Sequence, residues 1–208
     1  MKKIDVKKHF KDLYGVSKGE PVLVDVPPMN YLMIDGIGDP NTSMEYADAV
    51  EAVFAVSHTV KFAVRSGELA IDYGVMPLEG LWWADDMSTF TLDDKSTWRW
   101  TMMIMQPAFV TRELIQNAIA KINQKKNLPV LPKIRLEPLD EGRAAQILHV
   151  GPFSTERAAI DRLHAFVDAH GKRSGKHHEI YLSDIRRADP TKWRTIIRQP
   201  VTAEAETS

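Results

Sequence analysis

Hydrophobic and polar positions along the chain follow first a strand-like and then a helix-like spacing. In residues 22–26 valine alternates with other residues, and a second extended run at 31–34 ends before two glycines, so both segments are predicted strands. From Ser43 to about residue 57 the apolar residues have helical spacing, which indicates an amphipathic helix with Ser43 as its N-cap. The chain is therefore predicted to begin with two strands and a helix.

Two extended segments and a second helix follow. Residues 70–83 (AIDYGVMPLEGLWW) and 96–107 (STWRWTMMIMQP) have strand-like composition and are separated by a polar, turn-like stretch, so we expect a long hairpin. Residues 111–127 show the clearest helical spacing in the chain, and Pro129 and Pro132 end that helix. The first half thus predicts a mixed α+β unit.

The second half of the chain repeats this order of elements. A strand at 143–153 is followed by a helix at 155–170 and by strands at 177–184 and 193–201. Overlaying the two halves places several pairs of residues together, among them Gly38 with Gly151, Glu79 with Glu179, Leu81 with Tyr181, and Trp100 with Trp193. Because each half covers only one face of its small sheet, the two halves are predicted to pair about a pseudo-twofold axis.

The predicted fold class is α+β, with two strand-helix-strand-strand repeats that form antiparallel sheet around a central ligand cleft. We place the first repeat at about 21–128 and the second at about 133–201 of a single domain. Residues 1–20 have a short helical pattern and are predicted to be an N-terminal docking helix. Residues 202–208 are predicted to be a flexible tail.

The strand at 177–184 (HHEIYLSD) carries a carboxylate in an otherwise half-buried pattern. Side chains alternate between the faces of a strand, so Glu179 and Tyr181 share a face and lie roughly 7 Å apart along it. That separation allows both to contact one small molecule. The alternative is that this face is the solvated side of an antiparallel sheet.

Under the overlay, Glu79 approaches the same cleft from the opposite side, with a tryptophan and Tyr181 as aromatic walls. Neighbouring residues in a strand point in opposite directions, so at most one of Trp82 and Trp83 faces the cleft. Glu79 shares a face with Trp83 if the strand is regular, which slightly favours Trp83, although Gly80 permits a bulge.

Composition and charge narrow the classes of partner. The chain has 208 residues, and 27 Lys and Arg nearly cancel 28 Asp and Glu, so neither nucleic acid nor a membrane is a predicted partner. The chain contains no cysteine, which excludes disulfides and thiolate chemistry and fits a reducing compartment. The N-terminus lacks the apolar segment of an export signal, so the expected location is cytoplasmic.

Metal and cofactor signals are weak. His177 and His178 are adjacent, so on a strand they point to opposite faces, and no third ligand follows at a suitable spacing. We therefore predict no metal site. The nucleophile-elbow, P-loop and dinucleotide-binding motifs are missing, so no cofactor is predicted. His149 ends a strand and is a candidate ligand contact, although a lone histidine there is more often structural.

Several segments together resemble one protein family, the GyrI-like small-molecule-binding domains related to the ligand-binding modules of multidrug-responsive regulators. The resemblance covers about residues 20–201. The segments that carry it are PLEGLWW (77–83), ILHVGPFSTE (147–156), HHEIYLSDIRR (177–187) and IIRQPV (196–201). It implies a cleft for flat, apolar and often cationic compounds, with Glu179 as the acid at its base and Tyr181 beside it.

A stand-alone branch of this family, similar in its PLEGLWW segment, contains cyclopropanoid cyclopropyl hydrolases. These enzymes detoxify DNA-alkylating cyclopropapyrroloindole compounds by opening the three-membered ring with water. Ile185 stands where we expect a proline from the resemblance, a change that alters the turn more than the chemistry. Because binding and hydrolytic members share the cleft, the resemblance indicates the ligand class better than the reaction.

The hydrolase hypothesis gives each candidate residue a role. Glu179 would be the base that activates water, Glu79 would raise its proton affinity, and Tyr181 would donate a hydrogen bond to the developing phenolate. The tryptophans predicted to stack on the flat ring systems are Trp82, Trp83 and Trp100.

Three functional classes remain on sequence grounds. The first is a hydrolase of cyclopropane-bearing xenobiotics, and the second is a non-catalytic binding or sensing protein for multiple drugs. The third is a protein-interaction domain, for which the sequence shows no apolar stripe or acidic tail. The PLEGLWW segment slightly favours the hydrolase.

Overall fold

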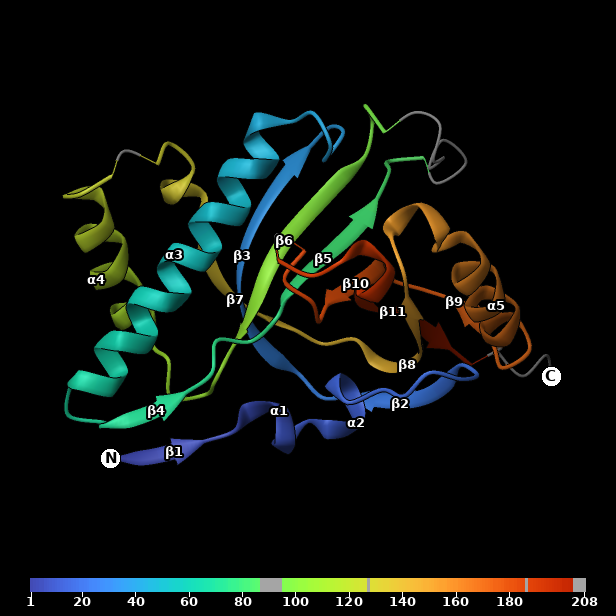
Figure 1. Cartoon of the computed structure of the whole chain (residues 1–208), viewed down its shortest axis with the longest axis horizontal. Coiled ribbons are helices and arrows are strands. Elements are labelled where there is room, and N and C mark those ends of the chain that lie inside the picture. Colours follow the sequence, from blue (N-terminus) through green and yellow to red (C-terminus); the bar gives the residue numbers. More distant parts are fainter. Residues whose placement is uncertain (87–94, 127, 186, 204–208) are drawn as a thin grey trace. The chain divides into compact units, whose positions relative to one another are not determined.

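The computed structural model describes residues 1–86, 95–126, 128–185 and 187–203 (Figure 1). Its chain divides into two compact units. Unit 1 comprises Met1–His9 and Met29–Leu139, and unit 2 comprises Phe10–Pro28 and Asp140–Ser208. Most of the predicted hairpin loop and most of the predicted flexible tail, namely residues 87–94 and 204–208, lie outside the described residues.

Unit 1 is a four-stranded antiparallel sheet covered by two helices. The strands are ordered β5-β6-β3-β7, and α3 packs on β3 and β6 with α4 beside it (Figure 1). A separate parallel pair joins β1 to β4. The elements are β1 (Lys2–Ile4), α1 (Val6–His9), β3 (Met29–Ile37), α3 (Met44–Ser66), β4 (Ile71–Tyr73), β5 (Leu78–Trp83), β6 (Arg99–Gln106), α4 (Arg112–Asn123), the 3-10 turn Leu131–Lys133 and β7 (Arg135–Leu139).

Unit 2 has the same plan with a single covering helix. Its strands are ordered β2-β8-β11-β10, and the short strand β9 pairs with the C-terminal end of β11. Helix α5 packs on β8 and β11. The elements are α2 (Lys11–Tyr14), β2 (Val22–Val26), β8 (Gly142–Val150), the 3-10 turn Phe153–Thr155, α5 (Arg157–Asp168), β9 (Lys172–Arg173), β10 (His177–Tyr181), the 3-10 turn Pro190–Lys192 and β11 (Arg194–Thr202). The α+β class and the strand-helix-strand-strand order of both halves are confirmed.

The outer strands of the two units are exchanged along the chain. β2 precedes β3 directly, yet it pairs with β8, while β7 precedes β8 and pairs with β3. The repeat boundaries in the structure therefore differ from 21–128 and 133–201, since β2 belongs to unit 2 and β7 to unit 1. Pro27 and Pro28 lie between β2 and β3, and two prolines do not form the turns that close a tight hairpin.

The N-terminal segment also differs from the expected docking helix. Residues 1–20 contain β1 and two helical turns of four residues each, α1 and α2. An isolated helix this short is marginal, so pairing with β4 and contacts with the rest of each unit decide its conformation. Leu13 and Tyr14, two apolar residues of this segment, are buried.

The first predicted helix is confirmed at its start and extends further than expected. The Ser43 hydroxyl accepts a hydrogen bond from the Tyr46 backbone N–H at 3.2 Å, which caps α3. The helix ends at Ser66 rather than near residue 57, because Val60 and Val64 continue its buried stripe.

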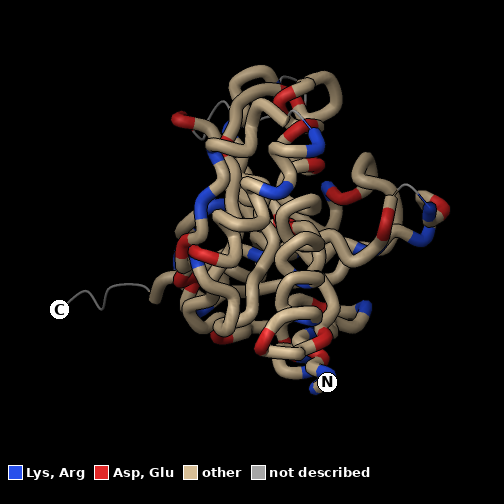
Figure 2. The backbone as a smooth tube through the Cα atoms, turned by 90° about the vertical axis from the view of Figure 1, so that its left-hand side faces the viewer, with Lys and Arg blue, Asp and Glu red and all other residues tan. Residues whose placement is uncertain are grey.

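None of the described helices is long and apolar enough to cross a membrane. Figure 2 shows Lys and Arg interspersed with Asp and Glu along the chain.

Gly36 on β3 is predicted to be intolerant of a side chain. A Cβ atom at this position would clash with Cη2 of the Trp100 indole, which is fully buried. Replacing Gly36 with alanine should therefore lower the free energy of unfolding by about 1–3 kcal/mol, measured by urea denaturation. Gly19→Ala is the control, because a Cβ there meets nothing within 4 Å. Equal midpoints for the two variants would contradict this packing.

Candidate functional site

Strand β10 places three polar side chains on the face of the unit 2 sheet that α5 covers. Glu179 lies opposite Ile197 on β11, and Ile197 belongs to the core cluster that packs under α5. Because side chains alternate, His177, Glu179 and Tyr181 share this face. We call these three residues the Glu179 group. The predicted alternation of the strand is confirmed as far as Tyr181, where β10 ends.

Hydrogen bonds hold the Glu179 carboxylate in place through both of its oxygens. The Tyr181 hydroxyl donates to Oε2 at 2.7 Å, and His177 Nε2 lies 3.0 Å from Oε1. The Glu179 side chain is 15% exposed and the His177 side chain 9% exposed. Donors to a carboxylate stabilise its charged form, so this largely buried group is held as an oriented anion.

An aromatic cluster adjoins the Glu179 group. The Phe153 ring lies edge-on to Tyr181 at 5.7 Å between centroids and contacts Trp193 at 5.0 Å. Phe153 is 38% exposed. Sequence analysis did not single out Phe153, although it lies in the ILHVGPFSTE segment directly after a strand. An anion beside aromatic rings, one of which is exposed, is suited to flat ligands and to cations.

His149 makes the contacts of a structural residue. Its Nε2 atom lies 3.2 Å from the Pro152 carbonyl oxygen and 3.3 Å from the Thr155 hydroxyl. These contacts fix the turn between β8 and α5, where Gly151 has a positive φ of 142°. A role for His149 in ligand binding stays a prediction.

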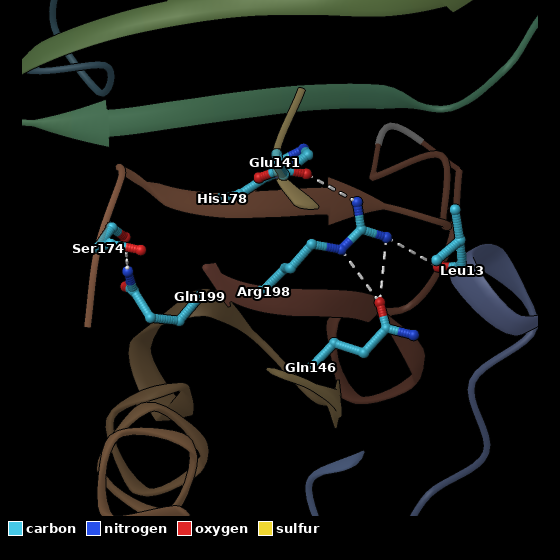
Figure 3. A network of polar contacts seen from close by, with 7 residues as sticks. All are labelled: Leu13, Glu141, Gln146, Ser174, His178, Arg198 and Gln199. Atoms are coloured by element: carbon cyan, nitrogen blue, oxygen red, sulfur yellow. Dashed lines mark hydrogen bonds and ion pairs between the residues drawn. The ribbon is translucent and has the colours of Figure 1, made fainter. Parts of the chain in front are cut away.

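The opposite face of the same sheet contains a buried charged network that sequence analysis missed. Glu141, Gln146, His178 and Arg198 form it, and we call it the Arg198 network (Figure 3). Arg198 lies opposite His178 on β10 and opposite Gln146 on β8, so the three form a row across the sheet. His177 and His178 thus point to opposite faces, as predicted.

Glu141 is the anion of the Arg198 network. His178 Nδ1 lies 2.9 Å and 3.0 Å from its two oxygens, and Arg198 Nη1 donates to Oε2 at 3.1 Å. Burial alone would raise the pKa of Glu141, but the charges and hydrogen bonds of His178 and Arg198 outweigh it and lower that pKa to about 2. The buried negative charge of Glu141 is therefore compensated by its contacts with His178 and Arg198.

The same network fastens the helical turn α2 to the sheet. Arg198 Nη2 donates to the Leu13 carbonyl at 3.2 Å (Figure 3). Gln146 Nε2 donates to the Asp12 carbonyl at 2.7 Å. These carbonyls lie at the C-terminal end of α2, where backbone acceptors lack helical partners. The N-terminal segment of unit 2 is thus held by polar contacts as well as by apolar burial.

In unit 1, the hydrogen-bonding pattern corrects the overlay of the two halves. The Gly38 N–H donates to the Trp98 carbonyl at 2.8 Å, and the Gly151 N–H donates to the Trp193 carbonyl at 2.9 Å. Trp98, not Trp100, is therefore the counterpart of Trp193. The overlay matched similar letters in the sequence, whereas the strand register is set by these paired glycines.

The corrected register changes the counterpart of Glu179. Glu179 pairs across the unit 2 sheet with Ile197, and Ile197 pairs with Ile147. When the two sheets are aligned on the paired glycines, the residue of β5 that takes the place of Glu179 is Gly80. Gly80 therefore replaces Glu79 as the counterpart of Glu179, and Trp82 is the counterpart of Tyr181. β5 pairs with β6 in unbroken register from Leu78 to Trp83, without the bulge that Gly80 would permit.

Trp82 occupies the space above Gly80. A Cβ atom on Gly80 would lie 2.8 Å from Trp82 Nε1, so the indole covers the position that a side chain would take. Trp82 also lies 6.0 Å from Tyr46 of α3, ring centroid to centroid. Trp82 is therefore on the helix-covered face of its unit, as Tyr181 is in unit 2.

The other residues predicted from unit 1 have different surroundings. Trp100 is fully buried and makes an edge contact with Tyr46 at 5.3 Å. Glu79 is also buried, and alternation along β5 places it with Trp83 on the face away from α3. Ligand contacts by these residues and by Trp82 stay predictions. The part of the chain that the structure describes has no group of three or more metal-ligating side chains.

The family model for the GyrI-like small molecule binding domain matches residues 19–202. The chain belongs to this family. It is 40% identical to a hydrolase from Listeria innocua, with a TM-score of 0.83, covering 97% of this chain and 100% of that one. It is 39% identical to an uncharacterized conserved protein from the same organism, with a TM-score of 0.85 and coverage of 96% and 100%.

More distant comparisons concern the fold alone. The C-terminal domain of EcmrR matches with a TM-score of 0.55 at 15% identity, covering 88% of this chain and 98% of that domain. No curated protein matches the chain. The GyrI-like resemblance seen in the sequence is confirmed by the family match.

Proposed function

We propose that this GyrI-like domain binds flat, apolar or cationic small molecules at the Glu179 group and hydrolyses cyclopropane-bearing alkylating compounds. The observation that carries the proposal is a carboxylate held through both oxygens and bordered by aromatic rings, one of them exposed. An aromatic surface binds a flat ligand, and a fixed anion attracts a cation. The 40% identical hydrolase from Listeria innocua supports a hydrolytic reaction.

In the proposed reaction, Glu179 accepts a proton from water while the water oxygen forms a bond to the cyclopropane methylene carbon. The ring bond to that carbon breaks, and its electron pair enters the conjugated dienone, which becomes a phenolate. The proton held by Glu179 then passes to the phenolate oxygen, directly or through solvent, so the net change is the addition of one water. Tyr181, whose hydroxyl is fixed on Oε2, orients the base for the first step.

The experiment compares the wild type with Glu179→Gln on a cyclopropapyrroloindole compound, followed by liquid chromatography with mass detection. We expect a water adduct from the wild type and a rate lower by about 100-fold or more in the variant, because glutamine does not accept the proton. Glu20→Gln is the matched control, since that side chain is 84% exposed. Equal rates for wild type and Glu179→Gln would overturn the assignment of Glu179.

A non-catalytic binding protein is the second candidate, because the family is defined by small-molecule binding. In that case the compound is bound and recovered unchanged, and Glu179→Gln weakens the binding without any adduct in either protein. Roles in detoxification, a cytoplasmic location and the lack of nucleic-acid or membrane partners stay predictions.

A further inference from the structure

We propose that a groove in unit 1 is a second binding site, and that it takes a small aromatic carboxylate. The groove lies where the N-terminal segment, which forms β1 and α1, borders β4 and the C-terminal part of α3 (Figure 1). Its volume is about 570 Å³, within the range of about 300–1,000 Å³ that is usual for small-molecule sites. The lining consists of residues 3–7, residues 72–76 and Lys61. All of them belong to unit 1, whereas the Glu179 group belongs to unit 2, so this site is additional to the one in the proposed function.

The groove opens where two paired strands separate. β1 and β4 run in parallel, and their pairing ends where Ile4 lies opposite Tyr73. Beyond this point one chain turns into α1, and the other leads to β5 through residues 74–77. No backbone hydrogen bond joins residues 74–76 to another residue that the structure describes. The groove is therefore bordered by backbone donors and acceptors that a ligand can use.

Tyr73 is the candidate hydrogen-bond donor among the side chains of the groove. It is 4% exposed, and its buried hydroxyl has no hydrogen-bond partner among the described residues. Burial raises the pKa of Tyr73 to about 12, so the hydroxyl keeps its proton at neutral pH. The Phe109 ring packs edge-on against it, at 5.3 Å between centroids. A buried hydroxyl without a partner is costly, so an acceptor atom supplied by a ligand is favoured.

The charges around the groove favour an anion. The lining contains three lysines and two aspartates, so its net charge is +1. Both aspartates have a cationic partner: Asp72 lies 3.8 Å from Lys61 Nζ, and Asp5 lies 3.7 Å from the ammonium group of the lysine three positions later. Lys3 and Lys7 are exposed and form no ion pair with any described residue. These two lysines are therefore available to an acidic group of a ligand.

The base of the groove is apolar. Val6, Tyr73 and Met76 line it, and each is less than a tenth exposed. A flat apolar body that covers these side chains gains from the hydrophobic effect. An inorganic anion would use the lysines alone, and a neutral aromatic compound would use the base alone. An aromatic carboxylate uses both, which is why we assign this ligand class.

The test is the affinity of the full chain for 2-naphthoate, measured by isothermal titration calorimetry at neutral pH. We expect the neutral analogue 2-naphthamide to bind more weakly by about fivefold or more, because it is not attracted by the lysines. Lys3→Gln combined with Lys7→Gln should weaken 2-naphthoate binding by about fivefold or more for the same reason. Tyr73→Phe should weaken it by about threefold or more, because the variant keeps the ring and removes only the hydroxyl.

A matched control separates a specific site from general attraction by charge. Lys121, on α4, and Lys125, just after it, are exposed and do not line the groove. Lys121→Gln combined with Lys125→Gln changes the net charge by the same amount as the double variant in the groove. Its affinity for 2-naphthoate should stay within about twofold of the wild type, because salt screens exposed charges.

Each outcome decides the inference. If the wild type does not bind 2-naphthoate, or the groove double variant binds it as tightly as the wild type, the site is wrong. An equal loss in the Lys121 and Lys125 control would also overturn it. Unchanged affinity of Tyr73→Phe would overturn the role of the hydroxyl. Altered affinity in Glu179→Gln would assign the ligand to the Glu179 group instead. None of these results depends on hydrolysis, so the two proposals fail separately.

Discussion

Replacing Arg198 with methionine is expected to lower the free energy of unfolding by about 3–5 kcal/mol. The Arg198 side chain is fully buried, and it donates to Glu141, Gln146 and the Leu13 carbonyl. Removing Arg198 takes one of its two charged or hydrogen-bonding neighbours from buried Glu141 and leaves that charge less well compensated, with His178 still in contact. Urea denaturation monitored by circular dichroism measures the effect.

Two further variants make this prediction specific. Arg194→Met, on the same strand but exposed, should change stability by less than about 0.5 kcal/mol. Arg198→Met combined with Glu141→Leu should recover part of the loss, because an apolar pair of similar volume is often as stable as a buried ion pair. If the double variant is less stable than Arg198→Met, the uncompensated charge of Glu141 is not the cause.

Acid is expected to remove about 3 kcal/mol of stability through Glu141. The His178 and Arg198 contacts lower the pKa of this carboxyl to about 2 in the folded protein, from 4.5 for an unperturbed glutamate side chain. Its folded pKa is depressed, so the contribution is fully present above about pH 4.5 and is lost as the pH falls toward about 2. The free energy of unfolding should therefore decline over this window.

The comparison with Glu141→Gln isolates this group from the other carboxylates. The variant is less stable at neutral pH because it lacks the anion that His178 and Arg198 surround. Since glutamine does not titrate, the difference in unfolding free energy between wild type and variant should shrink as the pH is lowered. A difference that stays constant from about pH 6 to about pH 2 would contradict the coupling.

Local sequence patterns predicted which segments form helices and strands better than they predicted which strands pair with one another. The alternation in HHEIYLSD correctly placed Glu179 and Tyr181 on one face, and the helical spacing after Ser43 correctly started α3. Both depend only on neighbours in sequence. The exchange of β2 and β7 depends on which sheet edge each strand joins, and the alternation within a strand does not encode that choice.

Among the polar contacts of unit 2, some join residues that are close in sequence and others join residues that are far apart. His177 is two positions from Glu179, so the spacing alone could have indicated their contact, but the adjacent histidines were considered only as metal ligands. The Arg198 network joins Glu141 to Arg198 and to Leu13, which are far apart in sequence. No local pattern brings such residues together, and only the strand pairing does.

Overlaying the two halves by similar residues placed the strands of unit 1 in the wrong register. Glu79 matched Glu179 because the segment LEGLWW was laid over HEIYLS, and both segments lie between the repeated glycine and the repeated tryptophan of their half. An error of one residue in such a match moves a side chain to the other face of its sheet. The glycine-to-tryptophan hydrogen bonds in each unit resolve the register, and they assign Trp82 rather than Glu79 to the helix-covered face.

The exchanged strands set the order in which the chain can fold during synthesis. Every element of unit 1 has left the ribosome soon after Leu139, so its sheet can close early. β2, by contrast, must wait for β8, since Val22 pairs with Gln146 roughly 120 positions later in the chain. Until then the apolar side chains of residues 10–28 have no sheet to cover them, so a chaperone that binds this segment would protect it while β8 is still being made.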